Sequence, residues 1–365
     1  MIPAILHRAL TLALLFAPLA LSQGLVFLGT WPKQIQVIDE TKRKVIDHIE
    51  LATGVADRLR ISDDRKTIYV ATVDHNGIEV IDVATRKNIN AFALDHGGTR
   101  VRFNSWAPDP ARGLIYLLIQ VAEKKIDRFE ISPPQFAVVD LAQKKIVRTA
   151  DLPEEARAAF DGRDNMRISP DGKQLYLFQN DILIFDTADF KIAGRIELAK
   201  LDVPGSARIN VGPAVDSLQE PGKLVNLFIS TDPVVHKQVF GIARLDLATR
   251  LFDFAPIGPA NISLLGLLVS PDHKTGYSVA ISGSNGNRRS EFWVFDLTTN
   301  RVVRKREFEA RTRYYFAISS TGKSLFIYGS GYEVEVYDAA TLQLRSTIDM
   351  KADITTDMIV APQNR

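Results

Sequence analysis

Arginine is the residue type whose placement in this sequence could do chemistry. A guanidinium presents N–H donors in a planar fork and binds carboxylates or phosphates through two parallel hydrogen bonds. Most of the candidate arginines occur in close pairs: Arg58 and Arg60, Arg100 and Arg102, Arg163 and Arg167, and Arg311 and Arg313, with Arg208 alone. If a fold gathered them, they would form an anion site; if they faced outward, acids such as Asp57 and Asp164 would neutralise them.

Other reactive side chains form no catalytic pattern. The histidines after residue 22 lack the spacing of metal ligands: His48, His75, His96, His236 and His273. The segment "STGKS" at 320–324 would need glycine instead of Ala317, and a following helix, to be a phosphate-binding loop. The sequence contains no cysteine, which excludes thiolate metal sites and covalent haem attachment. We therefore predict no catalytic residue, no metal site and no cofactor carried by this chain.

The elements that would position the arginines come from a repeat. An apolar strand that ends in aspartate, followed by a turn and another strand, occurs seven times, and successive aspartates are 42 to 60 residues apart. These aspartates are Asp39, Asp82, Asp140, Asp186, Asp246, Asp296 and Asp338. A second repeated sequence motif, as in "ISPDGKQLYLF" from Ile168, supplies two more strands per unit. Units of about 40–50 residues with four short strands indicate propeller blades.

One repeat is divided between the two ends of the chain. The segment "GLVFLGTW" from Gly24 reads as the second strand of a blade, and no first strand precedes it. The segment "TTDMIVAP" from Thr355 reads as the missing strand A. We predict an all-β, seven-bladed propeller over residues 23–365, closed by the C-terminal strand A joining the N-terminal strands B to D.

In such a ring the A strands are innermost, and the arginines lie at or just before them. We expect their N-terminal ends to converge on one mouth of the central channel. The candidate ligand- or partner-binding residues are Arg58, Arg60, Arg100, Arg102, Arg167, Arg208, Arg313, Tyr314 and Tyr315. Insertions in blade 3 ("AEKKIDRFEISPPQFAVVD"), blade 5 ("DSLQEPGKLVN") and blade 6 ("SGSNGNRRSE") are further candidate binding loops.

The first 22 residues have the pattern of a secretory signal peptide. A short basic region ending in Arg8 precedes the apolar run 9–21, and Ala20-Leu21-Ser22 forms a small-x-small cleavage site. We expect cleavage near Ser22 and a periplasmic protein without a membrane span. The formal net charge of +2 argues against nucleic acid as a partner.

The repeated motif "ISPDGKQLYLF" resembles the repeats of the exported YVTN-type β-propeller family. Three stretches are similar to the β subunit of quinohemoprotein amine dehydrogenases: the Pro-Pro hairpin of blade 3, "RYYFAISSTGKSLFIYG" from Arg313, and the ending "DMKADITTDMIVAPQNR". The resemblance is densest in residues 115–152 and 295–365. It implies a cofactor-free scaffold subunit in a periplasmic complex that oxidatively deaminates primary amines.

The same resemblance implies two partners. One is a small subunit that carries cysteine tryptophylquinone, and the other is a dihaem cytochrome subunit that carries haem c. On this hypothesis the chain is part of an enzyme and is not catalytic alone. The alternative is a free-standing exported propeller that binds a protein or a small anion.

Overall fold

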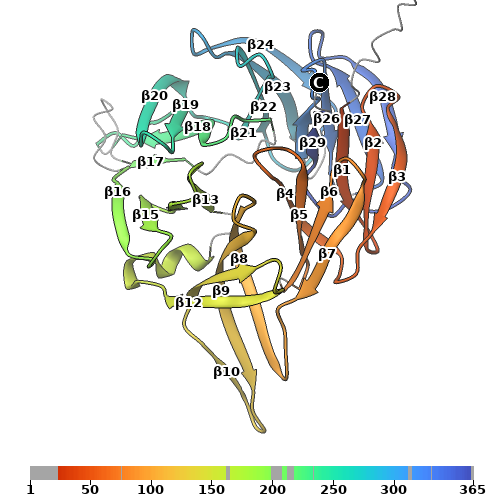
Figure 1. Ribbon diagram of the computed structural model, residues 1–365. Helices are drawn as coiled ribbons and strands as arrows, with labels where there is room; N and C mark the ends of the chain where they lie inside the picture. The colour runs from red at the N-terminus through yellow and green to blue at the C-terminus, as the bar shows by residue number, and fades with distance from the viewer. Residues whose placement is uncertain are drawn as a thin grey trace, which may run out of the picture.

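The structure, a computed structural model, describes eight stretches of the chain: 24–74, 76–161, 165–198, 208–211, 218–232, 234–310, 315–329 and 331–362. Their strands form seven antiparallel sheets, six with four strands and one with five. Figure 1 shows the sheets arranged as blades around a centre, so the predicted seven-bladed all-β propeller is confirmed. The predicted signal peptide, 1–22, lies outside the described residues. No helix in the described stretches is long and apolar enough to cross a membrane.

Each blade runs from an inner strand A to an outer strand D. Blade 1 contains β29 (Ile359–Ala361), β1 (Leu25–Thr30), β2 (Gln34–Asp39) and β3 (Lys44–Glu50). Blade 2 contains β4 (Ala56–Ile61), β5 (Thr67–Thr72), β6 (Gly77–Asp82) and β7 (Lys87–Ala93). Blade 3 contains β8 (Thr99–Asp109), β9 (Leu114–Lys124), β10 (Phe129–Ile131), β11 (Gln135–Asp140) and β12 (Lys145–Asp151).

The remaining blades follow in chain order. Blade 4 contains β13 (Met166–Ile168), β14 (Gln174–Phe178), β15 (Ile182–Asp186) and β16 (Ile192–Ile196). Blade 5 contains β17 (Arg208–Asn210), β18 (Lys223–Thr231), β19 (Gln238–Asp246) and β20 (Leu251–Pro259). Blade 6 contains β21 (Ser263–Val269), β22 (Thr275–Ser282), β23 (Arg289–Asp296) and β24 (Arg301–Phe308), and blade 7 contains β25 (Tyr315–Ile318), β26 (Ser324–Tyr328), β27 (Glu333–Asp338) and β28 (Leu344–Asp349). Two short 3-10 helices, η1 (Glu154–Asp161) and η2 (Asn285–Asn287), complete the described elements.

Each repeat aspartate ends strand C and organises the turn to strand D. The carboxylate of Asp39, for example, accepts backbone N–H groups from Thr41 at 2.9 Å and Lys42 at 2.8 Å. The fourth residue after each of the seven aspartates has a positive φ, between 52° and 60°. None of these residues is glycine, so the turn must offset the cost of placing a residue with a side chain in the left-handed region of backbone conformation. They are Arg43, Arg86, Lys144, Phe190, Arg250, Asn300 and Leu342.

Each outer strand also contains a β-bulge. In blade 1, Val37 pairs with Asp47 and Ile38 pairs with Val45, which leaves Ile46 without a partner across the ladder. The same kind of register shift occurs between strands C and D of the other six blades. A bulge bends and twists an edge strand, which makes it a poor template for pairing with another chain.

Apolar side chains from adjacent blades pack face to face and hold the blades together. Between blades 3 and 4, the ring of Phe136 lies 4.9 Å from that of Phe185 in an edge-on contact. The same ring stacks on Phe190 at 4.7 Å. Both faces of each sheet are therefore covered, as the apolar B strands predict, and the ring needs every blade to be complete.

The divided repeat closes the ring. Strand β29 pairs with β1 through Leu25 with Ala361, Val26 with Val360 and Phe27 with Ile359, which confirms the predicted split blade. The contact continues beyond β29, because the hydroxyl oxygen of Thr356 accepts the N–H of Gly29 at 2.8 Å. A Cβ at position 29 would lie 2.5 Å from Cγ2 of Thr356, so only glycine fits this approach.

A second contact joins blade 1 to blade 7. The carboxylate of Glu40 accepts the N–H of Ser320 at 2.8 Å and its hydroxyl at 2.6 Å. Burial raises the pKa of Glu40, and the two hydrogen bonds from Ser320 oppose that rise. The ladder completes blade 1, and side-chain hydrogen bonds and apolar packing then hold blade 1 against blade 7.

Deleting residues 354–365 should abolish folding of the ring. The deletion removes the β29 ladder and the buried side chains of Met358, Ile359 and Val360. At about 1.5–3 kcal/mol for each large side chain, the loss approaches the whole stability of a typical domain. Thr356→Ala, which removes two hydrogen bonds of about 1 kcal/mol each and leaves the strand ladder in place, should only lower the melting temperature, by several degrees. A deletion variant that melts like the wild type would show that the ring closes in another way.

Candidate functional site

Three of the predicted arginines, Arg58, Arg60 and Arg167, lie inside the A strands, further along the chain than expected. Strand β4 begins at Ala56, so Arg58 and Arg60 are its third and fifth residues, and Arg167 is the middle residue of β13. The sequence pattern placed them at the N-terminal ends, because it did not show where each strand begins. The structure brings two of them, Arg60 and Arg167, to one pocket.

The side chain of Arg58 is occupied by contacts that hold two strands together. Its guanidinium donates to the carbonyl oxygens of Asn104, at 2.5 Å, and Phe103, at 3.3 Å, in strand A of the next blade. It also forms an ion pair with Asp57 at 3.1 Å, and its side chain is only 10% exposed. Arg58 therefore ties β4 to β8, and it does not line the pocket that holds Arg60.

Arg60 and Arg167 are held beside each other by a shared acceptor. Nη1 of Arg60 donates to the carbonyl oxygen of Met166 at 3.3 Å, and Nη1 of Arg167 donates to the same oxygen at 2.8 Å. Arg60 also donates to the carbonyl of Trp106 at 2.5 Å, and its guanidinium lies 5.6 Å from the centre of the Trp106 ring. Two positive side chains are thereby fixed at the junction of blades 2, 3 and 4.

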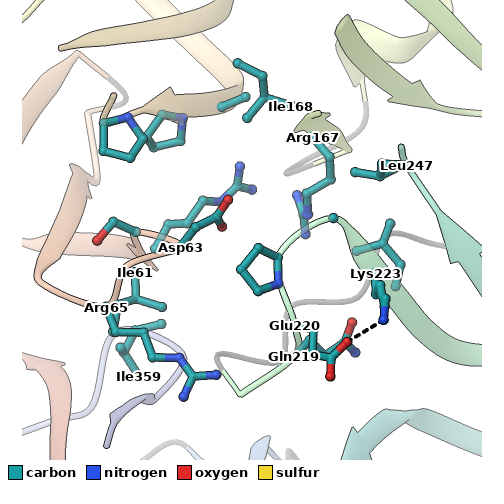
Figure 2. A pocket seen from close by; sticks show the side chains of 18 of the residues that line it. Ile61, Asp63, Arg65, Arg167, Ile168, Gln219, Glu220, Lys223, Leu247 and Ile359 are labelled. Atoms are coloured by element: carbon teal, nitrogen blue, oxygen red, sulfur yellow. Dashed lines mark ion pairs between the residues drawn. The ribbon is translucent and has the colours of Figure 1, made fainter. Parts of the chain in front are cut away.

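These two residues line the pocket shown in Figure 2. The pocket lies where strands A of blades 2, 3 and 4 end, beside the turns between strands A and B, rather than at the N-terminal ends. Its volume is about 140 Å³, similar to an engineered cavity of about 150 Å³ that admits benzene in another protein. Its charged lining residues are Arg60, Asp63, Arg65, Arg167, Glu220 and Lys223. Apolar side chains, including Ile61, Pro108, Ile168, Pro221, Leu247 and Ile359, form much of the wall.

Two carboxylates modify the charge of the pocket. Glu220 forms an ion pair with Lys223 at 2.7 Å, drawn as a dashed line in Figure 2, and the hydrogen bond from Lys223 lowers the pKa of Glu220. The side chain of Asp63 is exposed to the open mouth, yet the surrounding protein partly desolvates it. That desolvation raises the pKa of Asp63, the charge of Asp64 raises it further, and the charge of Arg60 opposes the rise.

The other candidates lie elsewhere. Arg100 and Arg102 are exposed on β8, in the part of blade 3 that extends beyond the ring, and Figure 1 shows this extension at β9 and β10. Tyr315 is half-buried and stacks on Tyr328 at 5.7 Å; the phenol oxygen of Tyr328 accepts the N–H of Met358 next to β29. Arg313 and Tyr314 lie outside the described residues, and so does the side chain of Arg208, although its backbone belongs to β17.

The sequence reasoning missed Asp63, Arg65, Glu220 and Lys223 as members of this site. A departure from the repeat marked the first two, since blade 2 has "SDDRK" where blade 4 has "SPDGK". Arg65 replaces the turn glycine at a φ of 59°, and its Nη2 donates to the carbonyl of Leu218 at 3.2 Å. The blade 5 insertion supplied Glu220 and Lys223. Within the described stretches, no group of three or more His, Asp or Glu side chains could hold a metal ion.

Comparisons with known proteins support the fold. No protein-family model matches the sequence, and no curated protein does. A functionally unknown protein from Desulfotomaculum acetoxidans DSM 771 has a TM-score of 0.56 and 13% identity, covering 94% of this chain and 100% of that chain. The dihydro-heme d1 dehydrogenase NirN has a TM-score of 0.52 and 12% identity, covering 92% and 74%. Hydrazine synthase from Kuenenia stuttgartiensis has a TM-score of 0.50 and 16% identity, covering 82% and 88%.

These identities are low, so the similarities establish a propeller and carry no information about activity. They also do not establish the β subunit of quinohemoprotein amine dehydrogenases as the specific relative. The chain is a propeller scaffold, and a propeller fold does not by itself specify a function.

The raised pKa of Asp63 gives a stability prediction with a definite sign. A carboxyl whose pKa is higher in the folded state stabilises the protein below its unfolded pKa, about 3.9, and that stabilisation is lost as the pH rises through the folded value. Asp63→Asn cannot ionise and escapes this loss. The melting temperature of the variant relative to wild type should therefore rise between pH 4 and pH 7. A difference that falls over this range would mean that Arg60 stabilises the Asp63 carboxylate more than desolvation disfavours it.

Proposed function

We propose that this chain is a binding propeller whose channel-end pocket receives an anionic group, either a small carboxylate or phosphate or the carboxylate of a partner's side chain. The observation that supports this most directly is the pair Arg60 and Arg167, whose guanidinium groups donate to one carbonyl oxygen, that of Met166. Because both side chains line the same pocket, one bound anion could interact with two guanidinium groups. Guanidinium groups also match carboxylate and phosphate oxygens in geometry.

The charge of the whole pocket has the same sign. Arg60, Arg65, Arg167 and Lys223 supply four positive charges, and the carboxylates of Asp63 and Glu220 supply two negative charges. The lining is therefore positive by two charges in a protein whose formal net charge is only +2. A concave site with apolar walls strengthens the attraction, because it keeps part of the water away from the charges.

The pocket is also the right kind of cavity for a small ligand. Apolar walls with a few converging polar groups are typical of binding sites, and here the polar groups are cations. A volume of about 140 Å³ accommodates a phosphate or a short dicarboxylate more readily than a nucleotide. The ligand class is thus set by charge and by size.

The role of β subunit in a periplasmic quinohemoprotein amine dehydrogenase is a more specific version of this proposal. Its support is the sequence resemblance in residues 115–152 and 295–365. In that complex the anionic group would be an acidic side chain of a partner, and cysteine tryptophylquinone and haem c would be carried by the small and cytochrome subunits. Export through the segment 1–22 would place the chain with these partners.

Co-expression with the neighbouring genes tests the complex. If they encode the quinone-bearing and cytochrome subunits, this chain should co-purify with haem absorbance and with dehydrogenase activity toward primary amines. The chain expressed alone should show neither haem absorbance nor dehydrogenase activity. A chain that stays monomeric and colourless in the presence of those subunits would favour the free-standing binding module.

The anion site is tested by calorimetric titration with phosphate, malonate and a tetraglutamate peptide. We expect at least one of these to bind with one-to-one stoichiometry, with affinity falling as salt is raised because ions screen the attraction. Arg167→Gln should weaken binding by about tenfold or more, since it removes charge-assisted hydrogen bonds worth about 1.5–3 kcal/mol. Binding of phosphate or malonate indicates a free small ligand, and binding of the peptide alone indicates a partner's carboxylates.

The matched control is Arg86→Gln, because Arg86 pairs with Asp47 on an outer strand away from the pocket. It should leave the affinity unchanged. Asp63→Asn should bind anions more tightly than wild type at neutral pH, since it removes a negative charge from the lining. Arg60 is a poorer test position, because its bond to Trp106 also stabilises the inner strands. The anion proposal fails if none of the three probes binds, or if Arg167→Gln binds them as wild type does.

A further inference from the structure

Blade 3 carries a long hairpin that no other blade has among the described residues. Strands β8 and β9 have 11 residues each, and β10 adds a short third strand beside the end of β9. Figure 1 shows this hairpin extending away from the ring at β10. Its sheet is continuous, because Ser132 pairs with Val121 through an N–H to carbonyl bond at 2.8 Å. The hairpin is therefore a preformed element.

The pairing register divides the hairpin side chains between two faces. Residues directly opposite in antiparallel strands point to the same face, and neighbours in one strand point to opposite faces. Arg100 is opposite Ala122, which is opposite Ile131, so these three share a face. Lys124 is opposite Phe129, and Arg102 is opposite Gln120, on that same face. Glu123 and Glu130 are opposite each other on the other face.

The face that carries the glutamates is electrically self-contained. Lys125 forms ion pairs with Glu123 at 2.6 Å and with Glu130 at 3.5 Å. Arg128 pairs with Glu130 at 2.7 Å and with Asp127 at 3.3 Å. The two cations are thus paired with three carboxylates, which leaves this face polar, hydrated and slightly negative.

The opposite face is apolar and cationic. Phe129 is 62% exposed and Ile131 is 63% exposed, which is unusual for neighbouring large side chains on a structured strand. Arg100, Arg102 and Lys124 are exposed on the same face. Among the described residues, no hydrogen bond or ion pair engages the side chains of these three cations. Two exposed apolar side chains thus share one face of the sheet with three cations that form no ion pair among the described residues.

We infer that this face, defined by Arg100, Arg102, Lys124, Phe129 and Ile131, is a docking surface for an acidic patch on a partner protein with an apolar centre. The apolar part of the partner covers Phe129 and Ile131, and its carboxylates pair with the cations. The aromatic and arginine content is typical of the residues that dominate binding at protein interfaces. Charge complementarity orients the partner and speeds the encounter. The inference does not depend on the anion pocket.

Two other occupants fit less well. A second copy of this chain would place Arg100 and Arg102 against the same arginines, and like charges would repel. A lipid surface would have to surround the hairpin tip, which also carries the carboxylates of Glu123, Asp127 and Glu130. Those carboxylates would be pushed against anionic lipid headgroups. A protein that covers only one face leaves them in water.

The inference is tested by photo-crosslinking in the native cells. A benzoylphenylalanine residue at position 129 projects from the apolar and cationic face, and the same residue at position 130 projects from the opposite face as a matched control. We expect position 129 to crosslink to one protein and position 130 not to. The crosslinked peptide should be rich in Asp or Glu next to apolar residues.

The arginines are tested in the same assay. Arg100→Gln with Arg102→Gln should lower the crosslink yield at position 129 by about fivefold or more, and added salt should lower the wild-type yield toward the same level. The control pair Lys87→Gln with Arg301→Gln removes two exposed cations from outer strands and should change nothing. All variants should melt like the wild type.

Three outcomes would overturn the inference. One is equal crosslinking from positions 129 and 130, or no crosslink from either. Another is a crosslink to a second copy of this chain. The third is binding of the purified protein to phosphatidylglycerol vesicles that is lost in Phe129→Ala, which would assign the face to lipid.

Discussion

The pairing of β29 with β1 is the interaction on which the rest of the structure depends. Each blade packs both faces against its neighbours, so a ring with one incomplete blade exposes two apolar faces and an open strand edge. The chain completes that blade with residues from both termini, through the ladder from Leu25 to Phe27 and the hydrogen bond between Gly29 and Thr356. The inner strands can converge on a central axis only because the ring is closed.

Closure explains how Arg60, an arginine with a structural role, also comes to line the pocket. Inner strands of adjacent blades approach each other but do not share a β ladder. Arg58 and Arg60 bridge this gap by donating to carbonyl oxygens of β8. Arg60 also reaches β13, where it meets Arg167 at the carbonyl of Met166. The contacts that join three blades therefore also bring two positive side chains to one pocket.

The outer strand edges of the blades differ between the regular repeats and the blade 3 hairpin. Bulges disturb the outer strand of every blade, and they protect the ring from pairing with other chains. The blade 3 hairpin departs from that protection, because it presents Phe129 and Ile131 to solvent on a regular, continuous sheet. The repeat is broken in blade 3, which carries the hairpin, and in blades 2 and 5, which supply turns that line the pocket.

Local sequence determined the blades. Each aspartate at the end of strand C imposes its turn through bonds within a few residues, as Asp39 does with Thr41 and Lys42, so seven blades and the split repeat followed from the sequence. It also marked arginine as the residue of interest, and it pointed to the insertions. Local sequence does not encode contacts between residues that are far apart in the chain. The hydrogen bonds of Arg58 and Arg60 are of this kind, because they join residues 46 positions apart.

Tertiary structure decided which arginines meet. Arg60 and Arg167 come together because the ends of β4 and β13 converge at the axis, and Arg58 is occupied because β8 lies beside it. Arg100 and Arg102 belong instead to the hairpin, because β8 extends past the ring and pairs there with β9. Asp63 and Glu220 joined the site through turns of blades that are far apart in the chain. The sequence by itself determined the repeating unit, since turns and strands are local; the composition of the pocket and of the hairpin face depended on ring closure and strand register, which only the folded chain defines.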